Sequence, residues 1–199
     1  MSPIIRVAGI DDAAGIADVY APAVLERSTS FELEPPTPDE FASRISTVLE
    51  KFPWLVCESA GECIGYAYAT AHRDRAAYRW SVDTAVYVSD RAHRRGVGTA
   101  LYVSLFGILS RQGYRNAYAG ITLPNPASEG MHLRAGFALV GIYKHVGYKF
   151  GAWHDVAWFE RSILPPEKDP REPVPFTEMR DSAEVAAALA KGQVLVRRL

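Results

Sequence analysis

Two spacings of apolar residues alternate along the chain and predict where its elements lie. Apolar side chains at Ile16, Val19, Tyr20 and Val24 recur every three or four positions, which is typical of one face of a helix. Elsewhere, short runs rich in β-branched and aromatic residues are bounded by glycine, proline or polar residues, and these predict strands. The expected strands cover residues 3–8, 54–58, 63–69, 82–88, 116–123, 137–146 and 153–161.

Helix signals lie between these strands. The first helix is expected to begin at Asp11 or Asp12, and later helices are expected over 98–112 and 126–135. A further helix begins at Thr37, because Thr37 with Glu40 three residues later forms a capping box. The turn at 59–62 joins two strands into a hairpin. This order, which mixes hairpins with a strand–helix–strand crossover, predicts an α/β (α+β) fold with a mixed sheet and helices packed on it.

The last part of the chain differs in composition. Five prolines fall between residues 165 and 175 in a charged stretch, which indicates a linker. Asp181 or Ser182 then caps an alanine-rich helix that ends near Gly192, and Val194 to Val196 could form an edge strand. We therefore expect one globular domain over 1–164 and a C-terminal extension over 165–199 that packs on it or supports a dimer.

Composition and charge narrow the function classes. Hydrophobic residues make up 48% of the 199 residues and the formal net charge is −1, which favours a globular protein and gives no reason to expect nucleic acid or an anionic membrane as partner. No apolar run is long enough to span a bilayer, and the first ten residues lack the pattern of a leader. Cys57 and Cys63 lack metal-site spacing. We expect buried thiols, no metal and a reducing, cytoplasmic setting.

Segment 82–101, VDTAVYVSDRAHRRGVGTAL, carries the most informative pattern. A strand runs into an arginine-rich turn, and Gly96 and Gly98 stand where a helix begins. Glycines let a backbone pass close to a ligand, and the free N–H groups of a helix N-terminus attract anions. The segment predicts a pyrophosphate site, although a glycine-rich helix start with solvated arginines would look the same. A Walker A loop is excluded because Gly-Lys-Ser/Thr is absent, and a dinucleotide fingerprint because Leu101 replaces its third glycine.

Segment 94–99, RRGVGT, following a strand, resembles the acyl-CoA pyrophosphate loop of the GNAT superfamily of N-acetyltransferases. That family has Gln or Arg three residues before the first glycine, where this chain has His93. The similarity is greater to one branch, the phosphinothricin and methionine sulfone or sulfoximine N-acetyltransferases, and covers about residues 3–164. The matching pieces are 29–32 (TSFE), 65–67 (GYA), 77–83 (AYRWSVD), 86–88 (VYV), 123–125 (LPN) with Ser128, His132 with 136–137 (GF), and 146–155 (VGYKFGAWHD).

The resemblance implies the acyl-CoA N-acyltransferase fold, with a mostly antiparallel central sheet flanked by helices, and acetyl-CoA as cosubstrate. It also implies that the strand before the glycine loop binds the acetyl group and the pantetheine arm through its backbone. The residues that it places against acetyl-CoA are Val86, Tyr87, Val88, Arg94, Arg95, Gly96, Val97, Gly98, Thr99, Asn125 and Ser128. Plain strand packing for the first three, and helix capping for the last two, remain open as alternatives.

Two residues are implied to act in catalysis. Asp83 stands where the branch has a Glu regarded as the general base, so the carboxylate is kept and one methylene is lost. His132 follows Asn125 by seven residues, where related enzymes often carry a Tyr that protonates the thiolate of CoA. Histidine can donate a proton near neutral pH. A loop ion pair for Asp83 and a structural hydrogen bond for His132 are the alternatives.

The acceptor site is implied by further similar positions. Arg73, Asp74 and Arg75 correspond to the substrate loop of the branch, and an arginine fork suits the carboxylate of an amino acid. Phe31 with Glu32 could form the opposite wall, and Tyr148, Lys149 and Trp153 form an aromatic and basic set whose alternative is hairpin packing. The residues expected to contact the amine substrate are Phe31, Arg73, Asp74, Arg75, Thr84, Ala85, Tyr148 and Lys149.

The predicted function is therefore transfer of acetyl from acetyl-CoA to a small amino acid or analogue, such as phosphinothricin or methionine sulfone. Neither cysteine has a reactive context, which favours direct transfer in a ternary complex. The branch also implies a homodimer. Alternatives are acetylation of a protein N-terminus, a polyamine or an aminoglycoside, and a non-catalytic acyl-CoA sensor. The arginines at 73 and 75 argue against a highly cationic acceptor.

Overall fold

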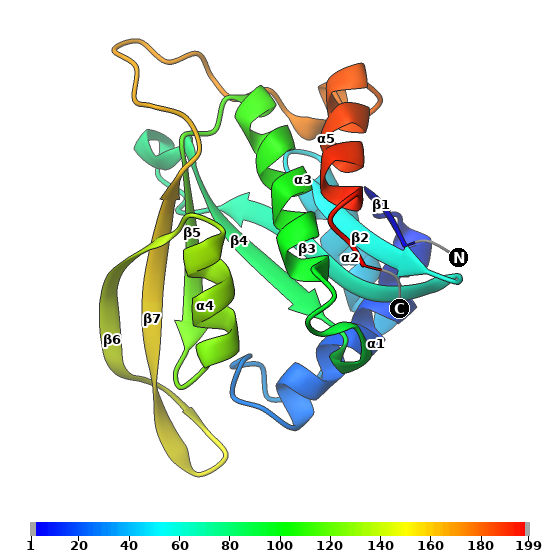
Figure 1. The fold of residues 1–199 in the computed structure, drawn as a ribbon. Helices are drawn as coiled ribbons and strands as arrows, with labels where there is room; N and C mark the ends of the chain where they lie inside the picture. The colour runs from blue at the N-terminus through cyan, green and yellow to red at the C-terminus, as the bar shows by residue number, and fades with distance from the viewer. Residues whose placement is uncertain (1–2, 198–199) are drawn as a thin grey trace.

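A seven-stranded sheet forms the frame of the computed structural model, which describes residues 3–197 (Figure 1). The strands follow the order β1-β2-β3-β4-β5-β7-β6 across the sheet. They are β1 (Ile4–Val7), β2 (Trp54–Ser59), β3 (Glu62–Ala71), β4 (Ser81–Val88), β5 (Asn116–Thr122), β6 (Ala138–Lys149) and β7 (Ala152–Ser162). The α-helices are α1 (Ala13–Leu25), α2 (Pro38–Leu49), α3 (Val97–Gln112), α4 (Pro126–Arg134) and α5 (Ala183–Gln193).

The central pair of strands is the feature that shapes the molecule. Every neighbouring pair is antiparallel except β4 and β5, which run parallel and are paired only over Ser81–Asp83 and Asn116–Tyr118. Beyond Asp83 the two strands separate and leave a V-shaped opening in the sheet (Figure 1). The mixed, mostly antiparallel sheet confirms the predicted fold class.

Helices cover both faces of the sheet. Helices α1 and α2 pack on one face, where Tyr20 and Phe41 meet the strand aromatics Trp54, Tyr66 and Tyr87 edge to face. Helices α3 and α4 lie on the other face, with α5 packed beside α3 (Figure 1). Apolar side chains on both faces are removed from water and form one continuous core.

The predicted capping box and the predicted turn after β2 are present in the structure. Thr37 Oγ1 accepts the Glu40 amide at 3.2 Å and Glu40 accepts the Thr37 amide at 2.6 Å, which is the predicted capping box. Ala60 and Gly61 both have positive φ in the tight turn between β2 and β3. The last hairpin is longer than predicted, because Phe150 and Gly151 make a two-residue turn and bulges let β6 continue to Lys149.

The C-terminal extension packs on the rest of the chain. Helix α5 begins at the predicted cap Ser182 and buries Val185 and Ala188 beside α3. The edge strand predicted over 194–196 is wrong. The amides of Leu195 and Val196 bond back to the carbonyls of Gly192 and Gln193, so they are not available for pairing with a strand.

Within residues 3–197, none of the helices combines the length and the apolar character needed to cross a bilayer.

Candidate active site

The backbone of β4 directs alternate peptide groups into the V-shaped opening. Ser89 donates to Ile64 at 3.0 Å and His72 donates to Ser81 at 3.3 Å, and these two bonds fix which residues of β4 bond to β3. By the alternation of an antiparallel ladder, residues 83, 85 and 87 bond to β3. The N–H and C=O groups of Val86 and Val88 therefore point away from β3, towards the side where β5 has separated.

A row of free amides stands at the end of this opening. Gly96 caps α3 in the left-handed conformation with φ of 83°, and Arg94 before it also has a positive φ of 61°. In the part of the chain that the structure describes, the amides of residues 96–99 have no hydrogen-bond partner. Since these groups carry the positive end of the helix dipole, they can bind the oxygens of a phosphate or pyrophosphate.

His93 has a role that the sequence did not suggest. Its Nε2 lies 3.1 Å from the carbonyl oxygen of Val88, so the ring can donate to the last residue of β4. The side chain thereby joins the end of the strand to the loop. Arg94, Arg95 and Thr99 are exposed around the amides.

Helix α4 closes the other side of the opening, and its polar residues are largely used within the protein. The side-chain oxygen of Asn125 caps the helix by accepting the Ser128 amide at 3.1 Å. His132 is 4% exposed, its Nε2 lies 2.9 Å from the Tyr102 hydroxyl, and its Nδ1 lies 2.9 Å from the Ser128 carbonyl oxygen. Burial lowers the pKa of His132 and favours the neutral ring. This ring positions α4 against α3, and its transfer of a proton to CoA stays a prediction.

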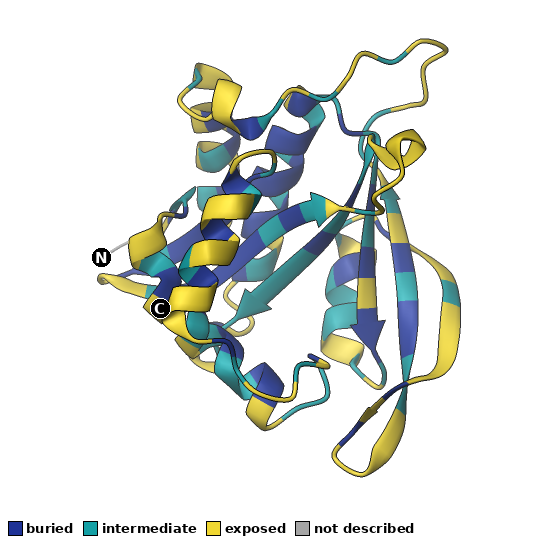
Figure 2. Cartoon of the chain, turned by 180° about the vertical axis from the view of Figure 1, so that it is seen from behind, coloured by how far each residue is buried: buried dark blue, intermediate teal, exposed yellow. Residues whose placement is uncertain are grey.

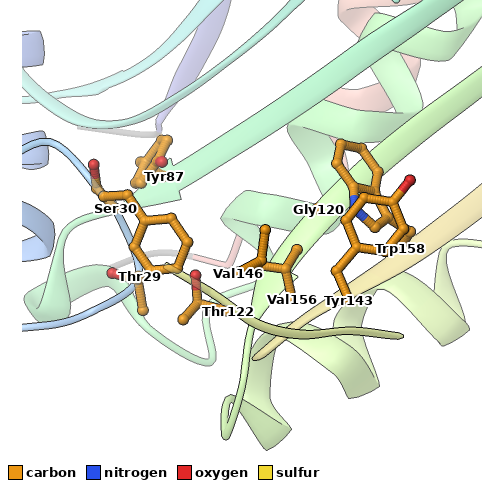
Figure 3. A pocket seen from close by; sticks show the side chains of 10 residues that line it. Thr29, Ser30, Tyr87, Gly120, Thr122, Tyr143, Val146, Val156 and Trp158 are labelled. Atoms are coloured by element: carbon orange, nitrogen blue, oxygen red, sulfur yellow. The ribbon is translucent and has the colours of Figure 1, made fainter. Parts of the chain in front are cut away.

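A cavity of about 350 Å³ lies on the opposite face of the sheet, between the loop after α1 and the strands β4 to β7 (Figure 3). Its wall is rich in hydroxyl groups and contains no charged side chain. The indole N–H of Trp158 in this wall has no hydrogen-bond partner among the described residues. The lining residues are Thr29, Ser30, Phe31, Tyr87, Gly120, Thr122, Tyr143, Val146, Val156 and Trp158.

The loop that bears Phe31 is held in place from two sides. Lys149 is 4% exposed and its Nζ donates to the carbonyl oxygen of Ser30 at 2.7 Å, while the Ser30 hydroxyl lies 2.6 Å from that of Tyr20. Burial lowers the pKa of Lys149. At Gly147 a Cβ would lie 2.3 Å from the Phe31 ring, so any larger residue would force this ring to move.

Asp83 lies at the base of the V, in the last residue pair that joins β4 to β5. Its Oδ1 is 2.6 Å from Nδ1 of His72, and the His72 ring stacks on Tyr118 with centroids 4.2 Å apart. Burial raises the pKa of Asp83, and the bond to His72 partly offsets this. Sequence reasoning missed His72. The ladder pairs it with Ser81, two residues from Asp83, so only the β3–β4 register could have revealed the contact.

The other residues expected to bind the amine are scattered. Thr84 is buried and its hydroxyl donates to the Tyr118 carbonyl oxygen at 3.1 Å, while Ala85 shares the face of Asp83. Arg73, Asp74 and Arg75 are exposed, and the charge of Arg73 lowers the pKa of Asp83 slightly. The Tyr148 side chain is 58% exposed and packs on Trp153, outside the cavity wall.

Residues 5–158 match the family described as the acetyltransferase (GNAT) domain. The chain belongs to the GNAT acetyltransferase family. The chain is thus an acetyl-CoA-dependent N-acetyltransferase.

Relatives within this GNAT family include enzymes with named substrates. The chain is 37% identical over 171 residues to the phosphinothricin N-acetyltransferase of Streptomyces viridochromogenes, covering 85% of this chain and 93% of that protein. It is 34% identical over 175 residues to the L-methionine sulfoximine/L-methionine sulfone acetyltransferase of Pseudomonas paraeruginosa, covering 85% and 100%. A crystal structure of a phosphinothricin acetyltransferase from Sinorhizobium meliloti in complex with AcCoA has a TM-score of 0.80 and 33% identity, covering 88% and 99%.

Proposed function

We propose that this GNAT enzyme acetylates the amine of a small amino acid or analogue of the phosphinothricin or methionine sulfone type. The observation that carries the proposal is the cavity wall between β4 and β7. Its hydroxyls at Thr29, Thr122 and Tyr143 offer neutral hydrogen bonds to a polar zwitterion. Because the wall has no carboxylate, it lacks the groups that would bind a polyamine or an aminoglycoside. The names of the relatives support the same class.

In this proposal the two reactants approach from opposite faces of the sheet. The amides of residues 96–99 bind the pyrophosphate of acetyl-CoA, and the peptide groups of Val86 and Val88 orient the pantetheine arm and the thioester. The amine enters from the cavity side and meets the thioester where β4 and β5 separate. Asp83 at the base of this opening supports removal of a proton from the amine.

Direct transfer without an acetylated enzyme is part of the proposal. Burial raises the pKa of Cys57 to about 12 and that of Cys63 to about 11, so both thiols stay protonated at neutral pH. A protonated thiol is a poor nucleophile. Cys57 is buried as expected, whereas Cys63 is only half-buried. Neither cysteine lies among the residues of the cavity wall.

We further propose that the enzyme is a homodimer and acts in the cytoplasm. The β6 surface supports the first point: Leu139, Val140, Ile142 and Tyr143 are exposed apolar side chains on a strand at the edge of the sheet (Figure 2). Exposed apolar patches and free strand edges favour association with another chain. Two unpaired thiols support the second point.

A thiol-release assay tests the function. Purified protein is supplied with acetyl-CoA and, in separate reactions, phosphinothricin, L-methionine sulfone, spermidine and an aminoglycoside. We expect release of CoA thiol with the first two amines and a mass gain of one acetyl group on each. Initial-rate lines that intersect would indicate a ternary complex. Release with the polyamine or aminoglycoside alone, or with none of a broader amine panel, would contradict the proposed acceptor class.

A further inference from the structure

His72, Asp83 and Tyr118 form a built cluster at the junction of β3, β4 and β5. The Asp83 carboxylate holds one nitrogen of His72 at 2.6 Å, and the ring of Tyr118 supports the flat face of the imidazole. Tyr78 meets the same ring edge to face at 5.9 Å. The His72 side chain is 13% exposed and that of Asp83 is 32% exposed, so the pair is sheltered but can be reached. Among the described residues, Nε2 of His72 has no hydrogen-bond partner.

This cluster lies on the same side of the sheet as the cavity. Side chains alternate along a strand, so Asp83 shares its face with Tyr87, and Tyr118 shares its face with Gly120. Tyr87 and Gly120 both line the cavity. Tyr118 and Gly120 are two residues apart, which places the cluster roughly 7 Å from the cavity wall along β5.

We propose that His72 is the catalytic base for the acceptor amine and that Asp83 orients it and stabilises its protonated form. This proposal rests on the proposed function. The N–H at Nδ1 donates to Asp83, which leaves the lone pair of Nε2 free to take a proton, directly or through one water. In catalytic triads, a carboxylate bonded to one nitrogen of a histidine likewise sets its tautomer and stabilises the imidazolium, while the other nitrogen accepts the proton.

The substrate ammonium loses one proton to Nε2 of His72 and gains a free electron pair on nitrogen. That nitrogen attacks the thioester carbon, a C–N bond forms, and the C–S bond breaks with its electron pair leaving on sulfur. The second proton lost by the nitrogen neutralises the CoA thiolate, and His72 returns its proton to solvent.

The shorter acid favours this arrangement over Asp83 alone. The resemblance leads one to expect Glu at this position, and Asp is one methylene shorter, so His72 restores the reach that the substitution removes. The titratable and charged groups around the pair are Arg73 in the following loop, Tyr78, Tyr118, Tyr68 and, on β7, Glu160, which pairs with Tyr118. Burial raises the pKa of Asp83, and the charge of Arg73 acts in the opposite direction.

Two substitutions of His72 distinguish a catalytic role of this residue from a packing role. His72→Asn keeps an N–H near Asp83 but has no proton acceptor, and His72→Phe keeps a ring for stacking on Tyr118 but lacks both nitrogens. The assay uses the full chain with acetyl-CoA and L-methionine sulfone or phosphinothricin, whichever the wild type accepts. Thermal melting and acetyl-CoA calorimetry show that each variant is folded. Asp169→Asn, a change of an exposed carboxylate in the extension, is the control.

We expect both His72 variants to lower kcat/KM by about 100-fold or more while acetyl-CoA affinity stays unchanged. The acidic limb of the pH profile, where protonated His72 cannot accept a proton, should disappear with them. The double variant His72→Asn with Asp83→Asn should lower kcat/KM no further than the worse of the two single variants, because the two residues act as one unit. If the wild type is active and His72→Phe keeps kcat/KM within about threefold and keeps its acidic limb, then His72 is not the base, while the proposed function still stands. A wild type that acetylates no amine overturns the proposed function instead, and with it the reaction that the pair would serve.

Discussion

Single residues determine whether the proposed acetyl-CoA site can form at all. Gly96 and the carboxylate of Asp83 could be identified from the sequence, because the glycine loop and the branch motif are contiguous along the chain. His72 and His93 could not, since their partners are Asp83 and the Val88 carbonyl and the contacts depend on strand register and loop shape. His132 shows the opposite case: its position matches a family motif, but its ring is buried among Tyr102, Phe137 and Phe159.

Gly96→Ala is expected to weaken acetyl-CoA binding. The residue has φ of 83°, and a Cβ there would meet the Leu195 carbonyl oxygen at 2.6 Å. A left-handed conformation costs a non-glycine residue about 1–2 kcal/mol, which corresponds to roughly a 5–30-fold weaker affinity if the loop must reform on binding. Calorimetric titration with acetyl-CoA measures this change in affinity.

Gly151→Ala is the matched control, because Gly151 also has a positive φ but lies in the hairpin turn with open space around it. An unchanged affinity in Gly96→Ala would show that the loop does not depend on this backbone conformation.

Pairs of elements shape the cavity that is proposed to bind the acceptor. The sequence predicted both strands of the last hairpin, but their length and twist depend on the turn at Phe150 and on bulges whose positions no periodicity reveals. The burial of Lys149 was also not predictable. Its partner is the Ser30 carbonyl, 119 residues away along the chain, and a lysine is usually solvated.

Lys149→Met is expected to loosen the loop over 28–37 and to raise KM for the amine. Methionine keeps the apolar stem but leaves the Ser30 carbonyl without its donor, and an unpaired buried acceptor costs about 1–3 kcal/mol. The melting temperature should fall and the affinity for acetyl-CoA should stay, because the amides of residues 96–99 lie on the other side of the sheet. Steady-state kinetics with varied amine measures the effect.

Lys168→Met, in the exposed part of the extension, is the control for loss of a lysine charge. If Lys149→Met raised KM for acetyl-CoA rather than for the amine, the assignment of the cavity to the acceptor would be contradicted.

At the scale of the whole molecule, the order of elements could be predicted and the opening of the sheet could not. Apolar periodicity sets which segments are strands and helices, and short connections restrict their order. The pairing of β4 with β5 ends at Asp83, and no local pattern in the sequence shows where two strands stop pairing. The extension over 194–197 illustrates the same limit, since its amides bond to the end of α5 and to the Arg95 carbonyl instead of to a strand.

The proposed dimer is tested by a charge on the β6 surface. Val140 is 58% exposed and lies outside the cavity wall, so Val140→Glu should preserve the fold while it places a charge in the apolar contact. We expect light scattering to find a dimer for the wild type and a monomer for Val140→Glu.

Ile10→Glu, at a residue 60% exposed and close after β1, the opposite edge strand of the sheet, should remain a dimer. A monomeric wild type at the concentration of the assay would refute the dimer.

Binding of acetyl-CoA through the amides of residues 96–99 is tested by a calorimetric titration of the purified protein with acetyl-CoA and, in parallel, with S-acetylpantetheine, which lacks the pyrophosphate and the adenosine. We expect saturable binding of one acetyl-CoA per chain. We also expect S-acetylpantetheine to bind at least about tenfold more weakly, because the charged hydrogen bonds from these amides are lost together with the nucleotide. Equal affinity for the two compounds, or no heat with acetyl-CoA, would contradict the assignment of the site.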